Sequence, residues 1–419
     1  MAHKPKRHQL AHSTSQQHRR VIVPAYLARF SCIGSACEDT CCSGWIVPVD
    51  RVSYRRYKDL QDPRLQAIFS RSLQPPEASG QSQTGLAVLH MEPSGRCGFL
   101  NDDSLCDLQL NGGEPLLCET CTAYPRVTTP VAGGFERAAV LSCPEAARLA
   151  LLSRDAMDLV EIVEPKSVRM NLQEHPYTGA AAGAGFRALR HGAAGLLRSG
   201  AGSLEARLLA LGLALRSLDR PSLTPAEVAA TFERYAASLA DLDKQLAAVE
   251  PRDALRTELL RELLVERFAT IQPPARYSDL VARVAGGLQL RADSSVQESV
   301  IERYGAALRD VYEPYLAERP WLLSNLLVNH IYSSLFPLGG GRSMSDEYVL
   351  LVVRYALIKL HLVGLAASAG QLTDADVVEA IHIFQRAVDH DPNFLPHVLD
   401  LLRDNDVTSM AFMAVLIVS

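Results

Sequence analysis

The chain has 419 residues, of which 48% are hydrophobic and 6% aromatic, enough apolar residues to bury a substantial core. Its net charge is −5, and the first 20 residues hold only basic charges, so residues 21–419 carry −10. That charge argues against nucleic acid as a partner and is compatible with a lysine-bearing protein surface. The longest apolar run, Met410–Val418, is shorter than the roughly 20 residues of a membrane helix, so we expect no membrane contact.

Residues 1–20 predict a disordered basic tail, because they combine lysine, arginine and histidine without an acid. They also lack the apolar run of a secretory signal, so we expect a cytoplasmic protein. The reducing cytosol disfavours structural disulfides, and clustered thiols there usually bind metal.

Residues 21–150 predict an irregular, cysteine-rich, metal-binding domain. All nine cysteines lie between Cys32 and Cys143, a crowding that packing does not explain. Turn residues such as Asn111-Gly112-Gly113 break this region into short elements, apart from an expected helix around Val52–Ser72.

The cysteine spacing is Cys32-x4-Cys37-x3-Cys41-Cys42, then Cys97-x8-Cys106-x11-Cys118-x2-Cys121-x21-Cys143. In an extended segment the adjacent Cys41 and Cys42 do not aim at one point, but a tight turn near Gly44 would let both reach a cluster. Radical S-adenosylmethionine enzymes normally show Cys-x3-Cys-x2-Cys, but Gly44 stands where the third cysteine would be. Nine soft ligands without paired histidines favour an iron–sulfur cluster, and a structural zinc held by four thiolates is the main alternative.

Residues 151–419 predict an α-helical domain, with helical periodicity from Glu145 onwards. Thr224-Pro225-Ala226-Glu227 predicts a capped helix to about Val249, and Thr373-Asp374-Ala375-Asp376 predicts another over Val377–Val388. The run Gly179–Gly185 suggests a connector. Further helical patterns cover Arg252–Ala269, Val296–Leu316, Leu322–Leu335 and Glu347–Ala367. The predicted fold class is mainly α.

Several separated blocks resemble the flagellin lysine-N-methylase (FliB) family. The resemblance covers most of residues 21–402 and is carried by Phe30–Trp45, Val49-Asp50, Tyr54-x2-Tyr57, Cys97–Leu100, Leu105-Cys106, Cys121–Arg126, Leu141–Pro144, Asn329–Pro337, Tyr348–Gly364 and Phe384–His390. It implies a bacterial methyltransferase that transfers a methyl group from S-adenosylmethionine to flagellin lysines and holds a [4Fe–4S] cluster. The implied metal ligands are Cys32, Cys37, Cys41, Cys42, Cys97, Cys106, Cys121 and Cys143. Cys118 falls outside the pattern.

Lysine methylation requires a neutral amine, because an ammonium with a pKa of about 10.4 has no lone pair. Glu38 and Asp39 lie between cluster cysteines and Tyr124 is close to Cys121, so these three are the candidate catalytic residues. Arg126 is the candidate contact for a cofactor carboxylate. Each also has a simpler structural interpretation, as a cap, a packed aromatic or an ion-pair partner.

No glycine-rich loop after a strand marks a nucleotide-type site, so use of S-adenosylmethionine rests on the resemblance. Histidines such as His382 and His390 lie on amphipathic helical patterns, where packed or surface roles are more common. Two other functions stay open: a non-catalytic zinc- or iron-binding protein that binds a partner through its helices, and a redox protein that uses a cluster for electron transfer.

Overall fold

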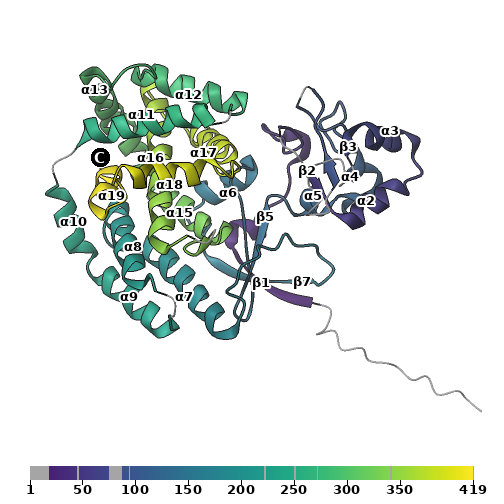
Figure 1. Cartoon of the computed structure of the whole chain (residues 1–419), viewed down its shortest axis with the longest axis horizontal. Helices are drawn as coiled ribbons and strands as arrows, with labels where there is room; N and C mark the ends of the chain where they lie inside the picture. The colour runs from purple at the N-terminus through teal and green to yellow at the C-terminus, as the bar shows by residue number, and fades with distance from the viewer. Residues whose placement is uncertain are drawn as a thin grey trace, which may run out of the picture.

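The computed structural model is mainly α-helical and has two parts, a large helical body and a smaller cysteine-rich lobe, with a β-sheet between them (Figure 1). It describes residues 18–44, 47–74, 87–93, 95–220, 223–249, 252–270, 272–339 and 342–418. Residues 1–17 of the predicted tail lie outside the described residues.

A four-stranded sheet joins the start of the chain to the helical body. Strand β1 (His18–Pro24) runs parallel to β6 (Gly134–Ala139) and antiparallel to β7 (Leu159–Pro165), while β5 (Arg126–Val131) pairs with the other edge of β6. His18–Arg20, expected in the tail, are therefore the first residues of β1. Strand β7 lies where we expected only helices; all seven of its residues pair antiparallel with β1, from Leu159 opposite Pro24 to Pro165 opposite His18.

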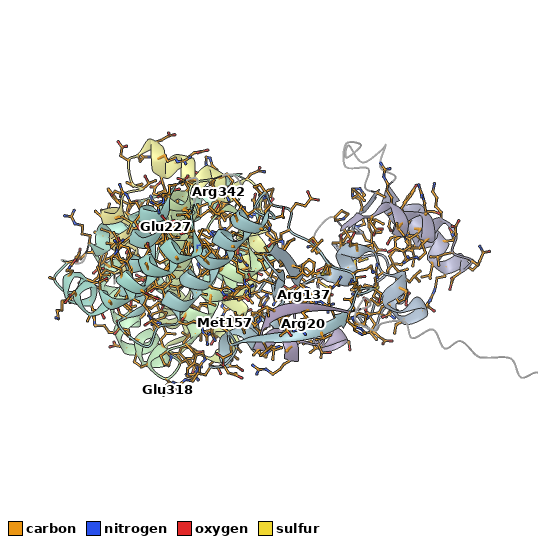
Figure 2. All side chains as sticks on the ribbon, turned by 90° about the horizontal axis from the view of Figure 1, so that it is seen from below. Arg20, Arg137, Met157, Glu227, Glu318 and Arg342 are labelled. Carbon is orange, nitrogen blue, oxygen red and sulfur yellow. The ribbon has the colours of Figure 1, made fainter. Side chains whose placement is uncertain are left out.

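Charged side chains cross-link this sheet. The carboxylate of Glu164 accepts two hydrogen bonds from the buried Arg137 guanidinium, both at 2.7 Å, and one from Arg19 Nε at 2.6 Å. Arg19 thus has a structural partner 145 residues away in sequence. Figure 2 shows the sheet, marked by Arg20 and Arg137, between the helical body and the lobe.

The helical body follows most of the predicted pattern. Its longer helices are α6 (Pro144–Leu152), α7 (Ala180–Leu197), α8 (Leu204–Leu218), α9 (Pro225–Ala237), α10 (Leu239–Ala247), α11 (Asp253–Thr270), α12 (Ala275–Leu288), α13 (Glu298–Ala307), α15 (Leu322–Ser333), α16 (Met344–Ala369), α17 (Asp374–Val388), α18 (Phe394–Asp404) and α19 (Met410–Ile417). A π-turn, η4 (Leu308–Tyr312), connects α13 to the short α14 (Glu313–Ala317). Thr224 and Thr373 both form the predicted capping boxes. The helix predicted to Val249 is instead divided at Ser238.

Helix α16 is the central helix of the body. It is the one described helix long and apolar enough to cross a membrane, but 94% of its most apolar window is buried inside the protein. Helices α8, α12, α17 and α19 pack around it (Figure 1). The apolar run at the end of the chain, Met410–Val418, docks against the body as α19, with Met413, Leu416 and Ile417 buried.

The glycine- and alanine-rich run is helical, which corrects the prediction of a connector. Gly179 is the N-cap of α7, and Gly183 and Gly185 lie buried in its first turns. A Cβ at Gly183 would meet the Tyr177 carbonyl oxygen at 3.0 Å, and one at Gly185 would meet the Leu223 carbonyl oxygen at 2.9 Å. The glycines therefore allow the neighbouring backbones to approach closely, although glycine lowers the intrinsic stability of the helix.

The lobe has its own small core. Strands β2 (Val47–Val49), β4 (Ala87–Leu89) and β3 (Leu73–Gln74) form an antiparallel sheet in that order. The helices of the lobe are α2 (Arg51–Lys58), α3 (Pro63–Ser72), α4 (Asp107–Gly112) and α5 (Glu119–Ala123). The single helix expected over Val52–Ser72 is therefore two, because Asp62 and Pro63 start a new helix with a carboxylate cap and a proline in its first turn.

Candidate metal centre between lobe and body

All nine cysteines are free thiols, and three of them begin helices. Cys106, Cys118 and Cys143 are the N-cap residues of α4, α5 and α6. The backbone amides of Gln109 and Leu108 act to lower the pKa of Cys106, and those of Ala146 and Glu145 act to lower the pKa of Cys143, although burial outweighs them in both cases. Amides at a helix start favour the ionised thiolate, the form that binds metal.

Four thiols gather where the lobe meets the body, and we call them the junction set: Cys32, Cys37, Cys41 and Cys143. Burial raises the pKa of Cys143 to about 11, and the neighbouring Cys37 and Cys32 add to the rise. The thiols of Cys42, Cys32 and Cys143, together with burial, raise the pKa of Cys41. Without a cation, these neighbours oppose one another's ionisation.

The other thiols lie in the lobe, and we call Cys42, Cys97, Cys106 and Cys121 the lobe set. Burial raises the pKa of Cys97 to about 12, with Cys42, Cys106 and Cys118 adding to the rise. Cys121 lies near Cys118, Cys42 and Cys106. Cys118 is 3% exposed and belongs to the lobe core. The thiols of the predicted ligands thus form two groups, which meet where Cys41 contacts Cys42.

The donor set fits an iron–sulfur cluster better than a single ion. In the described part of the chain, no three His, Cys, Asp or Glu side chains are arranged to hold a metal ion. A single zinc needs its thiolates drawn in to about 2.3 Å from one point. A cluster of several irons binds thiolates that stand further apart, and it prefers sulfur donors, which both groups supply.

Helix α17 of the body holds the first cysteine segment in place. Asp39, whose side chain is 10% exposed, pairs with Arg386 at 2.8 Å and with Arg276 of α12 at 3.3 Å. Arg386 also donates to the carbonyl oxygens of Thr40 and Ser43. His382 Nδ1 lies 3.7 Å from Asp39, and burial lowers the pKa of His382 to about 4.

The structure places the other predicted site residues around the junction set, each with a local partner. Glu38 pairs with Arg148 of α6, and its side chain is 39% exposed. Tyr124 is half-buried beside Cys143 and Cys41, and burial raises its pKa. Arg126 Nη2 donates to the Thr122 carbonyl oxygen at 3.0 Å. No carboxylate among the described residues forms an ion pair with Arg126.

A hydrogen-bonded chain runs from Tyr124 to the surface. Tyr124 Oη lies 3.1 Å from Ser142 Oγ, and His390 Nε2 lies 2.8 Å from the same Ser142 Oγ. Ser142 is 1% exposed, whereas His390 is exposed at the end of α17. Partial burial of its ring lowers the pKa of His390. Sequence reasoning missed Ser142 and left His390 without a role, although both lie within or beside recognisable sequence blocks.

Other polar residues of the helical half have structural contacts. Asn329 accepts from Tyr26 Oη at 2.6 Å and donates to the Ala139 carbonyl oxygen at 2.9 Å. His361 contacts the Leu357 carbonyl oxygen at 2.7 Å through Nδ1. Burial lowers the pKa of His330 to about 3. These residues pack the body and do not reach the cysteines.

A cavity lies within the helical body, and no cysteine lines it. It has a volume of about 560 Å³ and is lined by residues of α8, α10, η4 and α16, including Glu205, Tyr312, Tyr355 and Lys359. Lys359 is 5% exposed and lies 3.9 Å from Glu205. None of the predicted site residues lines this cavity.

Comparison with known proteins gives matches over nearly the whole chain. The family model described as the FliB lysine N-methylase C-terminal domain matches residues 193–416, more than half of the chain. Proteins named Lysine-N-methylase from Salmonella typhimurium and Salmonella choleraesuis are each 26% identical over 410 residues, covering 93% of this chain and 98% of theirs. A protein named Flagellar biosynthetic protein FliU from Salmonella muenchen is 33% identical over 143 residues, 34% of this chain and 82% of its own. No solved structure matches.

Proposed function

The chain belongs to the FliB lysine N-methylase family, and from this we propose that it is a lysine N-methyltransferase that acts on flagellin. The observation that carries the proposal is the alignment with the Salmonella lysine-N-methylases, which leaves only 2% of their length unmatched. It therefore includes both the cysteine-rich part and the helical body. The name of the FliU relative supports the flagellar link.

The proposed methyl donor is S-adenosylmethionine, whose sulfonium supplies an electrophilic methyl group when bound. Arg126 would hold its carboxylate, because the guanidinium is held by the Thr122 carbonyl oxygen, two residues before Tyr124, and forms no ion pair with a described carboxylate. The proposed [4Fe–4S] cluster would bind to cysteine thiolates near the same place. We assign it no reaction step.

The residues of this chain can remove the proton that blocks the lysine nitrogen. A lysine next to Tyr124 would have a route to solvent through Ser142 and His390, whose separations of 3.1 and 2.8 Å allow proton transfer along hydroxyl groups. His390 is neutral at pH 7 because its pKa is lowered, so its ring can accept the proton. Glu38, whose side chain is 39% exposed at the junction set, is the carboxylate that would meet the arriving lysine ammonium, whereas Asp39 is paired with Arg386 and Arg276 and would position its segment.

The proposed partner is flagellin, met in the bacterial cytoplasm before export. Residues 21–419 carry a net charge of −10, which favours the approach of a lysine-rich surface and disfavours nucleic acid. The proposal is tested by mass spectrometry of flagellin from cells with and without this chain. Methylated lysines found only with the chain are expected, and unchanged lysine masses would remove the proposal.

A further inference from the structure

We propose that the cavity of the helical body binds a small monocarboxylic acid with an apolar chain, and that Lys359 and Tyr312 hold its carboxylate. The inference does not rest on methyl transfer. None of the residues assigned to that reaction lines the cavity, so this is a second ligand site of the chain.

The cavity lies where elements that are distant in the sequence meet. Helix α8 packs against α10 and α16, and the π-turn η4 also packs against α16 (Figure 1). The volume of about 560 Å³ lies within the range of small-molecule sites. π-turns inside helices are frequent at functional sites, and the last residue of η4 is Tyr312, which lines the cavity.

Apolar side chains make up a large part of the cavity wall. They include Leu204, Leu246, Leu316, Leu323 and Val418, which come from four different elements and the end of the chain. Leu246 and Leu323 are 7% and 5% exposed. Such a wall favours a ligand with an apolar chain, because contact with it removes the chain from water.

Two polar groups of the wall lie close together and can hold a carboxylate. Tyr312 is 3% exposed, and its hydroxyl group has no hydrogen-bond partner among the described residues. A buried hydroxyl without a partner lowers stability, and an oxygen atom of a ligand would supply the acceptor. The Lys359 ammonium lies 5.9 Å from the ring centres of both Tyr312 and Tyr355, so the same carboxylate can pair with it.

The difference in burial between Lys359 and Glu205 favours an anionic ligand. The Lys359 side chain is 7% exposed, whereas that of Glu205, 3.9 Å away, is 31% exposed and accepts a hydrogen bond from Tyr355 Oη at 3.0 Å. Water screens Glu205 more than Lys359, so an added anion is attracted by the ammonium more than it is repelled by Glu205. Burial lowers the pKa of Lys359 to about 8, which agrees with an ammonium that Glu205 compensates only in part.

The other charged side chains of the wall have partners of their own or are exposed. Arg207 donates to three backbone carbonyl oxygens, and Asp243 accepts from the N-cap residue of α8. Arg319 pairs with Asp374 at 2.8 Å, and Glu313 is exposed. Because both arginines are engaged elsewhere, the ligand carboxylate is assigned to Lys359.

The test compares three ligands that share one apolar chain: octanoate, octan-1-ol and octylamine. Isothermal titration calorimetry with the full-length protein at pH 7 measures their affinities. Octanoate should bind saturably at one site per chain, and the alcohol and the amine should bind about tenfold more weakly or less, because neither brings a negative charge to Lys359. The inference is overturned if octanoate shows no saturable binding at millimolar concentration, or if octylamine binds as tightly.

Variants then locate the octanoate site. Tyr312→Phe should weaken octanoate binding about fivefold and Lys359→Met about tenfold or more, while both keep the size of the side chain. The control is Lys244→Met, which changes an 80% exposed lysine of α10 outside the wall and should bind octanoate like the wild type. Thermal unfolding shows whether the variants are folded. Unchanged octanoate affinity in folded Tyr312→Phe or Lys359→Met protein would overturn the proposed site, and the comparison of the three ligands on the wild type decides the question if a variant does not fold.

Discussion

Asp39, between two cysteines of the junction set, forms a 2.8 Å ion pair with Arg386 of α17. The two side chains are 10% and 19% exposed, and they join segments separated by more than 340 residues. This pair makes the helical body a support for the segment that carries the junction thiols Cys37 and Cys41, because Asp39 lies between them. The contact joins the part of the chain that the family model matches, which contains Arg386, to the N-terminal part that contains the cysteines.

Asp39→Asn should lower stability, because it leaves the Arg386 charge partly buried and unpaired, a cost of about 1–3 kcal/mol. The matched control is Glu38→Gln, whose ion pair with Arg148 is more than a third exposed and should contribute at most about 1 kcal/mol. Thermal unfolding of the two variants measures the difference. Equal melting temperatures would show that Asp39 does not anchor the segment.

His390→Gln should slow methyl transfer by about tenfold or more, because it removes the proton acceptor at the outer end of the Tyr124–Ser142–His390 chain. Its control is His397→Gln, which changes a partly exposed histidine of α18 that is paired with Glu266 of α11. Rates are measured between pH 6 and 9 with saturating substrates, and the deficit of His390→Gln should shrink at high pH, where a larger fraction of the lysine loses its proton without help. Equal rates for the two variants would remove the relay.

Gly287→Ala should destabilise the helical body, whereas Gly286→Ala should not. A Cβ at Gly287 would lie 2.5 Å from the Gly364 carbonyl oxygen and 2.6 Å from the Ser368 amide nitrogen of α16, while nothing lies within 4 Å of one at Gly286. Alanine at Gly286 should add about 0.5–1 kcal/mol through helix propensity. Thermal unfolding separates the pair, and a stabilising Gly287→Ala would disprove the close packing of α12 on α16.

Lys359 should make stability depend on pH in the alkaline range. Burial lowers its pKa from 10.5 to about 8, so between these values the unfolded chain holds a proton that the folded chain has lost. The free energy of unfolding should therefore rise with pH in this window, by about 1.4 kcal/mol per unit from this residue. Below pH 8 both states are protonated and the contribution is constant.

Lys359→Met removes that dependence while keeping the length of the side chain. Urea unfolding of both proteins at pH 8 and pH 9.5 measures it, with the wild type gaining stability relative to the variant at the higher pH. A difference that stays constant over this range would contradict the lowered pKa of Lys359.

Local signals in the sequence predicted the helices well. The capping boxes at Thr224 and Thr373 form as expected, because a cap depends only on residues within one turn. Strand β1 was missed, since its partners in β7 lie between 135 residues away (Pro24 with Leu159) and 147 residues away (His18 with Pro165) in the sequence. The helix over the Gly179–Gly185 run was missed for a similar reason. The small size of Gly185 is explained by its close approach to the Leu223 carbonyl oxygen, which is distant in the sequence.

The cysteine-rich site was only partly predictable. Clustering along the chain indicated a thiol-bound metal, but spacing does not say which thiols meet, and the division between Cys41 and Cys42 depends on the fold. Asp39 and Tyr124 were selected because they lie near cysteines in sequence. Their partners Arg386 and Ser142 lie in other blocks of the sequence, Phe384–His390 and Leu141–Pro144, and nothing in the sequence of those blocks shows that they meet Asp39 and Tyr124.

The most direct test of the account follows a labelled methyl group from S-adenosylmethionine to purified flagellin in the presence of the anaerobically purified chain. We predict label on lysine side chains with the wild type and with Cys118→Ser, and none with Cys41→Ser, which loses a junction thiol. Unlabelled lysines with a metal-loaded wild-type chain, or full labelling by Cys41→Ser, would contradict the account.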